Sequence, residues 1–159
     1  MIFLGIDPGL DGALASIASL VTLVDTPTLT VAGKGGVHRR EYNVHAMATS
    51  LCAFSGGRAF ALVELVHAMP GQGVRSMFTM GRGLGVWEGL LAGLGIPFAF
   101  VTPQRWKKSL MDGMGQDKDA ARLTAIRLFP EVAGQFARKK DHGRADAILI
   151  AEYARRTRA

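Results

Sequence analysis

The sequence predicts a single domain of the mixed α/β class, and three observations support that class. Three short apolar runs follow one another at the start of the chain, as in three antiparallel strands. A segment with helical spacing comes next, and further strand and helix patterns follow it. The chain has 159 residues, of which 48% are hydrophobic and 20% charged, which suits one packed core and argues against disorder.

The first strand is predicted at Ile2–Asp7, a nearly continuous apolar run that ends in an acid and then meets a proline and a glycine. Such a run is typical of a central strand that is buried on both faces. Ala13–Ile17 and Val21–Asp25 predict two more strands, with a hairpin turn at Asp11-Gly12. The segment Thr26–Glu41 is polar and rich in glycine and basic residues, so we expect a mobile loop there.

The middle of the chain alternates helix and strand patterns. Apolar residues at helical spacing predict a helix over Val44–Phe54 that packs on the sheet. Phe60–Glu64 predicts another buried strand that ends in an acid, and Val66–Arg75 predicts a turn-rich loop. A longer helix is then predicted over Ser76–Leu94.

That long helix carries a glycine at every fourth position, which places a flat stripe on one helix face: Gly81, Gly85, Gly89 and Gly93. Each glycine costs a helix roughly 1 kcal/mol relative to alanine, so we expect a close contact that offsets this cost. Two contacts would serve, namely packing onto the protein's own sheet or a helix–helix contact in a homodimer.

The last third of the chain predicts one strand and three helices. Phe98–Val101 predicts a fifth strand, and Pro103 fits the first turn of a short helix. After the flexible link MDGMGQ, Asp117 is the predicted N-cap of a helix that runs to Phe129. A final helix is predicted over Arg144–Arg156, with arginines at its C-terminal end, where the helix dipole favours them.

Charge is unevenly distributed along the chain. Residues 1–100 hold six basic and six acidic side chains, whereas residues 101–159 hold thirteen basic and seven acidic ones and carry the whole net charge of +6. A basic half on a neutral scaffold favours a polyanionic partner, with nucleic acid first among the candidates. An ordinary solvated surface is the alternative.

Cysteine usage and hydropathy indicate a compartment. Cys52 is the one cysteine in the sequence, which excludes a disulfide framework and a cysteine zinc site and fits a reducing cytoplasm. The N-terminal run meets Asp7 too early for a signal peptide. Leu84–Val101, the most apolar stretch, contains Glu88, two glycines and a proline, which argues against a membrane span. We therefore expect a soluble, cytoplasmic protein.

The chemistry is predicted to lie in acids at the ends of strongly apolar elements. Asp7 ends the run FLGID, Glu64 ends FALVE, and Asp146 begins DAILIA. Because desolvating a charge is costly, buried strands rarely end in a bare carboxylate. Carboxylates that meet at one edge of a sheet also repel one another unless a cation neutralises them. A hard divalent ion meets this need, and Mg²⁺ is the usual choice.

Two residues close to the last acid extend this set. His142 and Asp146 are spaced i,i+4, so they share one helix face. Asp141 precedes them and is either a ligand or a helix N-cap. The segment GIDPG alone also resembles the phosphate loop of actin-like sugar kinases and ATPases. Those enzymes bind nucleotide between two domains, for which 159 residues are too few.

The whole set of motifs resembles the RuvC-type Holliday-junction resolvases, particularly their short bacteriophage branch. The resemblance covers nearly the whole chain, in the order FLGIDPGLDGALA, ALVELVHAMPGQGVRSMFTMGRGLGVWEGLL, VTPQRWKK, DKDAARLTAIRLFP and KKDHGRADAILIAEYARR. It implies a ribonuclease-H-like mixed sheet with helices on both faces, with residues 1–159 as a single RuvC-like nuclease domain. It also implies a homodimeric endonuclease that nicks two strands of a four-way DNA junction symmetrically.

The resemblance also implies roles for individual residues. Asp7 and Glu64 match the first two catalytic acids of the family, and Asp146 matches the last. His142 matches a histidine that some members use in place of an acid one helical turn before that last acid. Other members have an acid three residues before it, where this chain has Gly143, so either His142 or Asp141 completes the metal site.

The predicted cofactor is Mg²⁺, with two ions in each active site and Mn²⁺ as a substitute. Two cations about 3.5–4 Å apart activate water and stabilise the leaving oxygen of the cut strand. Imidazole is a better ligand for Mn²⁺ than for Mg²⁺, so we expect at least equal activity in Mn²⁺ if His142 is a ligand.

Branched DNA is the predicted partner, and basic residues are predicted to contact it. Lys118 is further expected to stabilise charge on the phosphate at the active site. Longer relatives place an aromatic wedge three residues after the second acid, where this chain has His67, with Met69 close by. The predicted nucleic-acid-binding residues are Arg75, Arg82, Lys107, Lys108, Lys118, Arg122, Lys139 and Lys140. Arg138 belongs to the same basic run as the last two, and Trp106 is expected in the core rather than stacked on DNA.

Two other functions remain open on sequence grounds. One is a non-catalytic protein that binds branched DNA, and the other is a broader nuclease of the same fold that cuts flaps or DNA–RNA hybrids. The presence of every acid in the set favours an enzyme over a binding protein.

Overall fold

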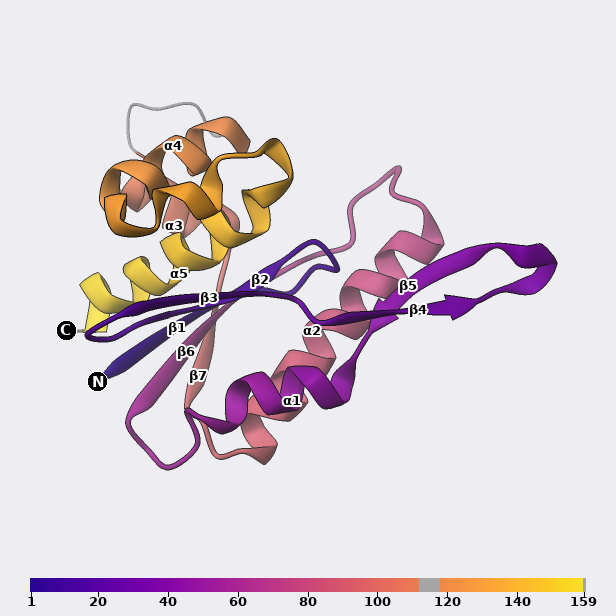
Figure 1. Cartoon of the computed structure of the whole chain (residues 1–159), viewed down its shortest axis with the longest axis horizontal. Coiled ribbons are helices and arrows are strands. Elements are labelled where there is room, and N and C mark those ends of the chain that lie inside the picture. Colours follow the sequence, from indigo (N-terminus) through magenta and orange to yellow (C-terminus); the bar gives the residue numbers. More distant parts are fainter. Residues whose placement is uncertain (112–117, 159) are drawn as a thin grey trace.

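A five-stranded mixed sheet forms the centre of the molecule (Figure 1). The structure is a computed structural model that describes residues 1–111 and 118–158, except for the side chains of Lys34 and Lys118. The strands lie in the order β3-β2-β1-β6-β7. Neighbours β3, β2 and β1 are antiparallel, whereas β1, β6 and β7 are parallel. The strand bounds are β1 Ile2–Asp7, β2 Ala13–Ile17, β3 Val21–Asp25, β6 Ala59–Glu64 and β7 Phe98–Val101. The predicted mixed sheet is therefore confirmed.

The segment that was expected to be a loop is instead a β-hairpin. Strand β4 (Thr28–Ala32) pairs with β5 (His38–Tyr42) in a separate antiparallel sheet that extends away from the main one (Figure 1). Gly35 and Gly36 have φ of 71° and 74°, a left-handed conformation that glycine adopts without strain. The prediction of a mobile loop was wrong because most side chains on both strands are exposed, so the usual apolar alternation is weak.

Helices cover both faces of the main sheet, as predicted (Figure 1). On one face lie α3 (Pro103–Leu110), α4 (Lys118–Leu128) and α5 (His142–Arg158), and on the other lie α1 (Val44–Cys52) and α2 (Val74–Gly93). The predicted helix before Pro130 is confirmed, whereas its proposed cap Asp117 lies outside the described residues. None of the described helices combines the length and the apolar character needed to cross a bilayer.

Helix α5 packs most tightly on the sheet. Ten of its seventeen residues are buried. It crosses β1 at Gly5, where a side chain would overlap the backbone oxygen of Ala147 and the backbone nitrogen of Ala151. This close approach fixes the N-terminal turn of α5 over the end of β1.

The glycine stripe of α2 faces away from the sheet. A Cβ atom on Gly81, Gly85, Gly89 or Gly93 would meet nothing within 4 Å among the described residues, so the alternative of packing on the protein's own sheet was wrong. Gly83, which the stripe does not include, is the buried one, since a side chain there would overlap Tyr42. The buried face of α2 is otherwise formed by Trp87 and Leu91.

Candidate metal centre and nucleic-acid surface

Asp7 and Glu64 end two neighbouring parallel strands at the same edge of the sheet. Strands β1 and β6 are in register, with Ile6 opposite Val63, so their final residues emerge together. A buried parallel pair of strands presents its carboxyl ends on one side, where the first turns of α5 also lie. The fold thereby brings residues from three distant segments to one edge.

Three of the predicted site residues form a compact group. Asp7, His142 and Asp146 each offer one ligand atom, and these atoms all lie within 4.8 Å of one another. All three side chains are half-buried. His142 and Asp146 stand one turn apart at the start of α5, as their spacing predicted. Two carboxylate oxygens and an imidazole nitrogen form a donor set that fits a divalent cation of the Mg²⁺ or Mn²⁺ type.

Glu64 lines the same cavity of about 260 Å³ as Asp7 and His142. Its Oε1 accepts a hydrogen bond of 2.9 Å from the indole nitrogen of Trp106, a side chain that is completely buried. Burial raises the pKa of Glu64 above its ordinary value, although the Trp106 hydrogen bond and the nearby charge of Lys107 oppose the shift. The expectation that Trp106 belongs to the core is confirmed, and the structure adds its contact with the second acid.

Glycines allow the metal-centre segments to approach one another. The backbone nitrogen of Gly9 donates a hydrogen bond of 3.1 Å to Asp7 Oδ1. At Gly12, a side chain would overlap the backbone carbonyl of Asp7, and at Gly143 it would overlap the backbone of Asp11. Position 143 therefore has no room for an acidic side chain.

The structure does not bring Asp141 into the group of three. Its buried carboxylate accepts hydrogen bonds from the backbone nitrogen of Arg138 at 2.9 Å and from the Arg138 guanidinium at 2.9 and 3.1 Å. The Arg138 side chain holds the pKa of Asp141 below its ordinary value. Asp141 thus stands at the third position of a capping box that closes the short 3₁₀ turn Lys139–Asp141 before α5, which is neither a ligand position nor the helix N-cap that the sequence predicted as the alternative.

A second ion pair holds the first turn of α5 to the sheet. Arg144 donates two hydrogen bonds, of 2.6 and 2.7 Å, to the carboxylate of Asp25 at the end of β3. The Arg144 hydrogen bond lowers the pKa of Asp25 despite partial burial. These residues are 119 positions apart, and no local pattern links them, so sequence reasoning missed the pair.

The basic residues predicted to contact DNA have different surroundings. Lys108, Lys139 and Lys140 are exposed, and the Lys107 ammonium lies 5.3 Å from the ring centre of Trp106. Arg122 is largely buried, and its guanidinium binds the backbone oxygens of Phe136 and Ala137 at 2.9 and 3.0 Å. It fastens α4 to the segment that follows, which leaves it poorly placed for DNA. Lys118 begins α4, and its side chain lies outside the described part of the chain.

The two residues considered as wedges, His67 and Met69, are both exposed in the connection between β6 and α2. That connection begins directly after Glu64, so the pair stands on the segment that leaves the metal centre. Their exposure suits contact with a ligand, and their role in opening a junction stays a prediction.

Arg75 and Arg82, which were predicted to contact DNA, line a groove whose other two arginines the sequence analysis missed. Arg39 and Arg40 on β5 face Arg75 and Arg82 on α2 across a cavity of about 390 Å³. Glu41 is the acid that lines this cavity, and it pairs with Arg39 at 2.8 Å and with Arg82 at 3.4 Å. The signal in the sequence was the adjacent pair Arg39 and Arg40, but only the hairpin brings this pair opposite α2.

Comparisons with known proteins agree on the architecture. The structure superposes on Thermus thermophilus RuvC with a TM-score of 0.56 and 18% identity, over 99% of this chain and 96% of that one. It superposes on T. thermophilus RuvC in complex with Holliday junction substrate with a TM-score of 0.59 and 15% identity, over the same shares. The fold is that of RuvC. The predicted ribonuclease-H-like class is thus confirmed.

A curated relative is similar in sequence. Over 95 residues, or 60% of this chain, the sequence is 38% identical to the protein named Holliday junction resolvase MOC1, chloroplastic, of Chlamydomonas reinhardtii. The aligned region spans 11% of the length of that algal protein. No family model matches the chain.

Proposed function

We propose that this protein is a divalent-metal-dependent endonuclease that resolves four-way DNA junctions. The observation that carries the proposal is the group formed by Asp7, His142 and Asp146, with Glu64 in the same cavity, at the strand ends of a RuvC fold. The name of the algal relative and the junction substrate bound to the Thermus RuvC support four-way junctions as the substrate class.

The residues of the site have different roles in this proposal. Asp7, Asp146 and His142 would hold Mg²⁺ or Mn²⁺, and Glu64 stands beside them with its orientation set by Trp106. Bound divalent ions supply an activated water and stabilise the leaving oxygen of the cut strand. The half-burial of the ligands limits competing water, and Lys118 is proposed to offset charge on the phosphate. Two ions in each site remain part of the proposal.

Resolution by paired nicks requires two active sites, and we infer a homodimer formed through α2. A symmetric pair of sites matches the symmetry of a four-way junction. Val74 and Phe78 on α2 are 79% and 74% exposed, and Gly81 and Gly85 continue the same helix face into open space. An apolar face of this kind, with small residues that admit a second helix, supports a contact between two copies.

The DNA surface in this proposal comprises both basic regions. Lys107, Lys108, Lys139 and Lys140 would contact backbone phosphates on the α5 side, and Arg75 and Arg82 would do so in the arginine groove. His67 and Met69 would contact the bases at the crossover. The resemblance of the quoted segments supports the short bacteriophage branch and action in the cytoplasm of a bacterial host.

Cleavage of a labelled four-way junction beside a linear duplex of the same sequence tests this function. The assay is run in Mg²⁺ and separately in Mn²⁺, with Asp7→Asn as the variant. We expect paired symmetric nicks in the junction alone, and a loss of at least about a hundredfold in Asp7→Asn with junction binding retained. Equal cutting of both DNAs would indicate a broader nuclease, a preference for a DNA–RNA hybrid would indicate a hybrid hydrolase, and binding without cutting would indicate a binding protein.

A further inference from the structure

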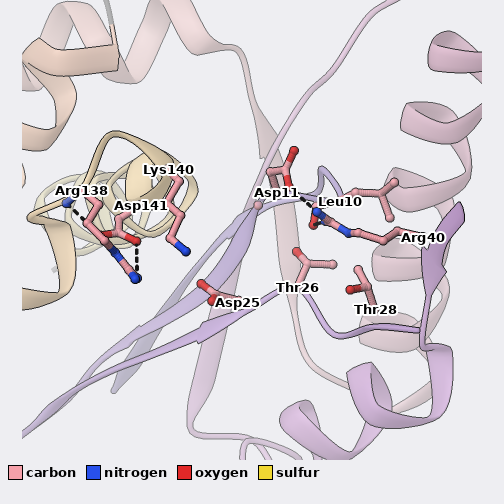
Figure 2. A pocket seen from close by; sticks show the side chains of 10 residues that line it. Leu10, Asp11, Asp25, Thr26, Thr28, Arg40, Arg138, Lys140 and Asp141 are labelled. Atoms are coloured by element: carbon pink, nitrogen blue, oxygen red, sulfur yellow. Dashed lines mark hydrogen bonds and ion pairs between the residues drawn. The ribbon is translucent and has the colours of Figure 1, made fainter. Parts of the chain in front are cut away.

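A second polar cavity lies directly beside the metal centre. Its volume is about 330 Å³, and it shares Leu10, Asp11 and Gly12 with the metal-centre cavity, so the β1–β2 turn is the wall between the two. The rest of its lining comes from the end of β3, the start of β4, Arg40 on β5 and the segment before α5 (Figure 2).

The acids that line this cavity already have guanidinium partners. Arg40 binds Asp11 at 2.8 Å, Arg138 binds Asp141, and Arg144 binds Asp25 from outside the lining. Lys140 lines the cavity as well, and no carboxylate of the described residues pairs with it. The lining itself carries three acids and three basic side chains, and with Arg144, which pairs with Asp25 from outside it, the basic side chains exceed the acids by one. Arg40 and Arg138 also use only part of their five N–H donors in these pairs.

Thr26 adds a hydrogen-bond donor to this charge. The residue is 4% exposed, its backbone nitrogen donates to the Gly12 oxygen at 2.9 Å, and its side chain points into the cavity (Figure 2). Its hydroxyl is buried and has no hydrogen-bond partner among the described residues. Buried polar groups in folded proteins almost always have a partner, so an unpartnered hydroxyl close to Lys140 favours a ligand with acceptor oxygens.

We propose that this cavity binds one backbone phosphate of the DNA strand that occupies the metal centre. Lys140 supplies the opposing charge, and the Thr26 hydroxyl donates to a phosphate oxygen. The inference rests on the proposed function, because it assigns the anion to DNA. A strand held both here and at the metal centre crosses the β1–β2 turn, which fixes its position relative to Asp7.

Junction binding measured over a salt series in EDTA tests the site without cleavage. Lys140→Gln is compared with Arg58→Gln, which removes one exposed positive charge at the opposite end of β6, and Thr26→Val is compared with Thr30→Val on the exposed face of β4. The slope of log K against log salt is negative, and we expect Lys140→Gln to make it less steep by about 0.9, the value for one lost phosphate contact. Arg58→Gln keeps the wild-type slope.

Thr26→Val removes a donor but no charge, so it weakens binding about threefold to tenfold at an unchanged slope, whereas Thr30→Val leaves binding as it is. Because both residues hold the same phosphate, the double variant Thr26→Val/Lys140→Gln loses less than the sum of the single losses. Unfolding of Thr26→Val at the wild-type temperature or above excludes a folding defect.

The outcomes separate this inference from the proposed function. If the wild-type protein cleaves junctions while Thr26→Val and Lys140→Gln bind as their controls do, the phosphate site is wrong and the nuclease stands. If the wild-type protein binds no junction, the proposed function is wrong, and inorganic phosphate becomes the probe at constant ionic strength. A rise in unfolding temperature that Lys140→Gln abolishes then supports an anion site, and the absence of any rise overturns it.

Discussion

Helices α5 and α2 cover opposite faces of the same sheet, and their small residues serve opposite purposes. On the α5 side, Gly5 and Gly143 have no room for a side chain, because backbone atoms of other segments occupy that space. On the α2 side, Gly81 and Gly85 face open space within the chain. The same residue type thus brings segments together on one face and leaves a flat outer surface on the other.

The difference between the two faces shows which contacts position the candidate metal ligands. The close contact of α5 with β1 sets the distance between His142 and Asp146 on the helix and Asp7 on the strand. Helix α2 meets the same region less closely, where a side chain at Gly83 would overlap the Pro8 oxygen and where Met80 lines the metal-centre cavity. Helix α5 contributes two of the three grouped residues, His142 and Asp146, whereas the glycine stripe of α2 faces open space among the described residues.

The contrast between the two faces is tested most directly by replacing one glycine with alanine on each of them. Gly5→Ala places a methyl group on the backbone of α5 and is expected to cost about 3 kcal/mol of unfolding free energy. Gly85→Ala meets no atom and improves helix propensity, so it is expected to stabilise a monomer by up to about 1 kcal/mol. Urea denaturation measures both, and changes of the same sign would contradict the contrast.

The second prediction concerns self-association through the exposed end of α2. Phe78→Glu places a charge on the apolar face and is expected to weaken the homodimer about tenfold to a hundredfold, the range for an important interface residue. Sedimentation velocity over a concentration series measures the shift. Leu20→Glu is the control, since Leu20 is 77% exposed in the turn after β2. A monomeric wild-type protein, or equal effects of the two variants, would contradict the proposed interface.

The third prediction tests His142 as a ligand on the α5 side. Imidazole is a better ligand for Mn²⁺ than for Mg²⁺. The loss of cleavage activity in His142→Ala should therefore be about tenfold larger in Mn²⁺ than in Mg²⁺, a difference of about 1.4 kcal/mol. Metal titrations of cleavage with each ion measure the difference. Equal losses in both ions would argue against direct ligation.

The smallest expected effect is at the ion pair between Asp25 and Arg144. The pKa of Asp25 in the folded protein lies below its ordinary value of 3.8, so its stabilising contribution is present above that value and is lost as the pH falls through the folded pKa. Asp25→Asn should therefore cost less than about 1 kcal/mol at pH 7, because the pair is partly exposed.

Urea denaturation at pH 7 and at pH 3 measures this cost, and the difference from wild type should shrink at the lower pH. Asp119→Asn removes an ion pair with Arg122 within α4 and serves as the control in the same unfolding measurements. A cost at Asp25 that is larger at pH 3 than at pH 7 would contradict the sign.

Elements with a strong local pattern were predicted to within about two residues. The bounds of β1, β2, β3 and β7 match the prediction, because each is an apolar run closed by turn residues or an acid. The β4–β5 hairpin was missed because its strands are mostly exposed and lack that pattern. Asp7, His142 and Asp146 were also recognised from sequence, by their position at element ends and by helical spacing.

Local sequence patterns specify which segments form the sheet and which acids end them, because apolar periodicity and turn chemistry act between near neighbours. Those patterns do not specify that His142 joins the acids while Asp141 binds Arg138, since that outcome depends on how the start of α5 packs over β1. The folded structure is also needed to show that the glycine stripe of α2 faces outward and that Thr26 and Lys140 line one cavity. Such contacts join residues far apart in the chain, and no local pattern encodes a distance of that kind.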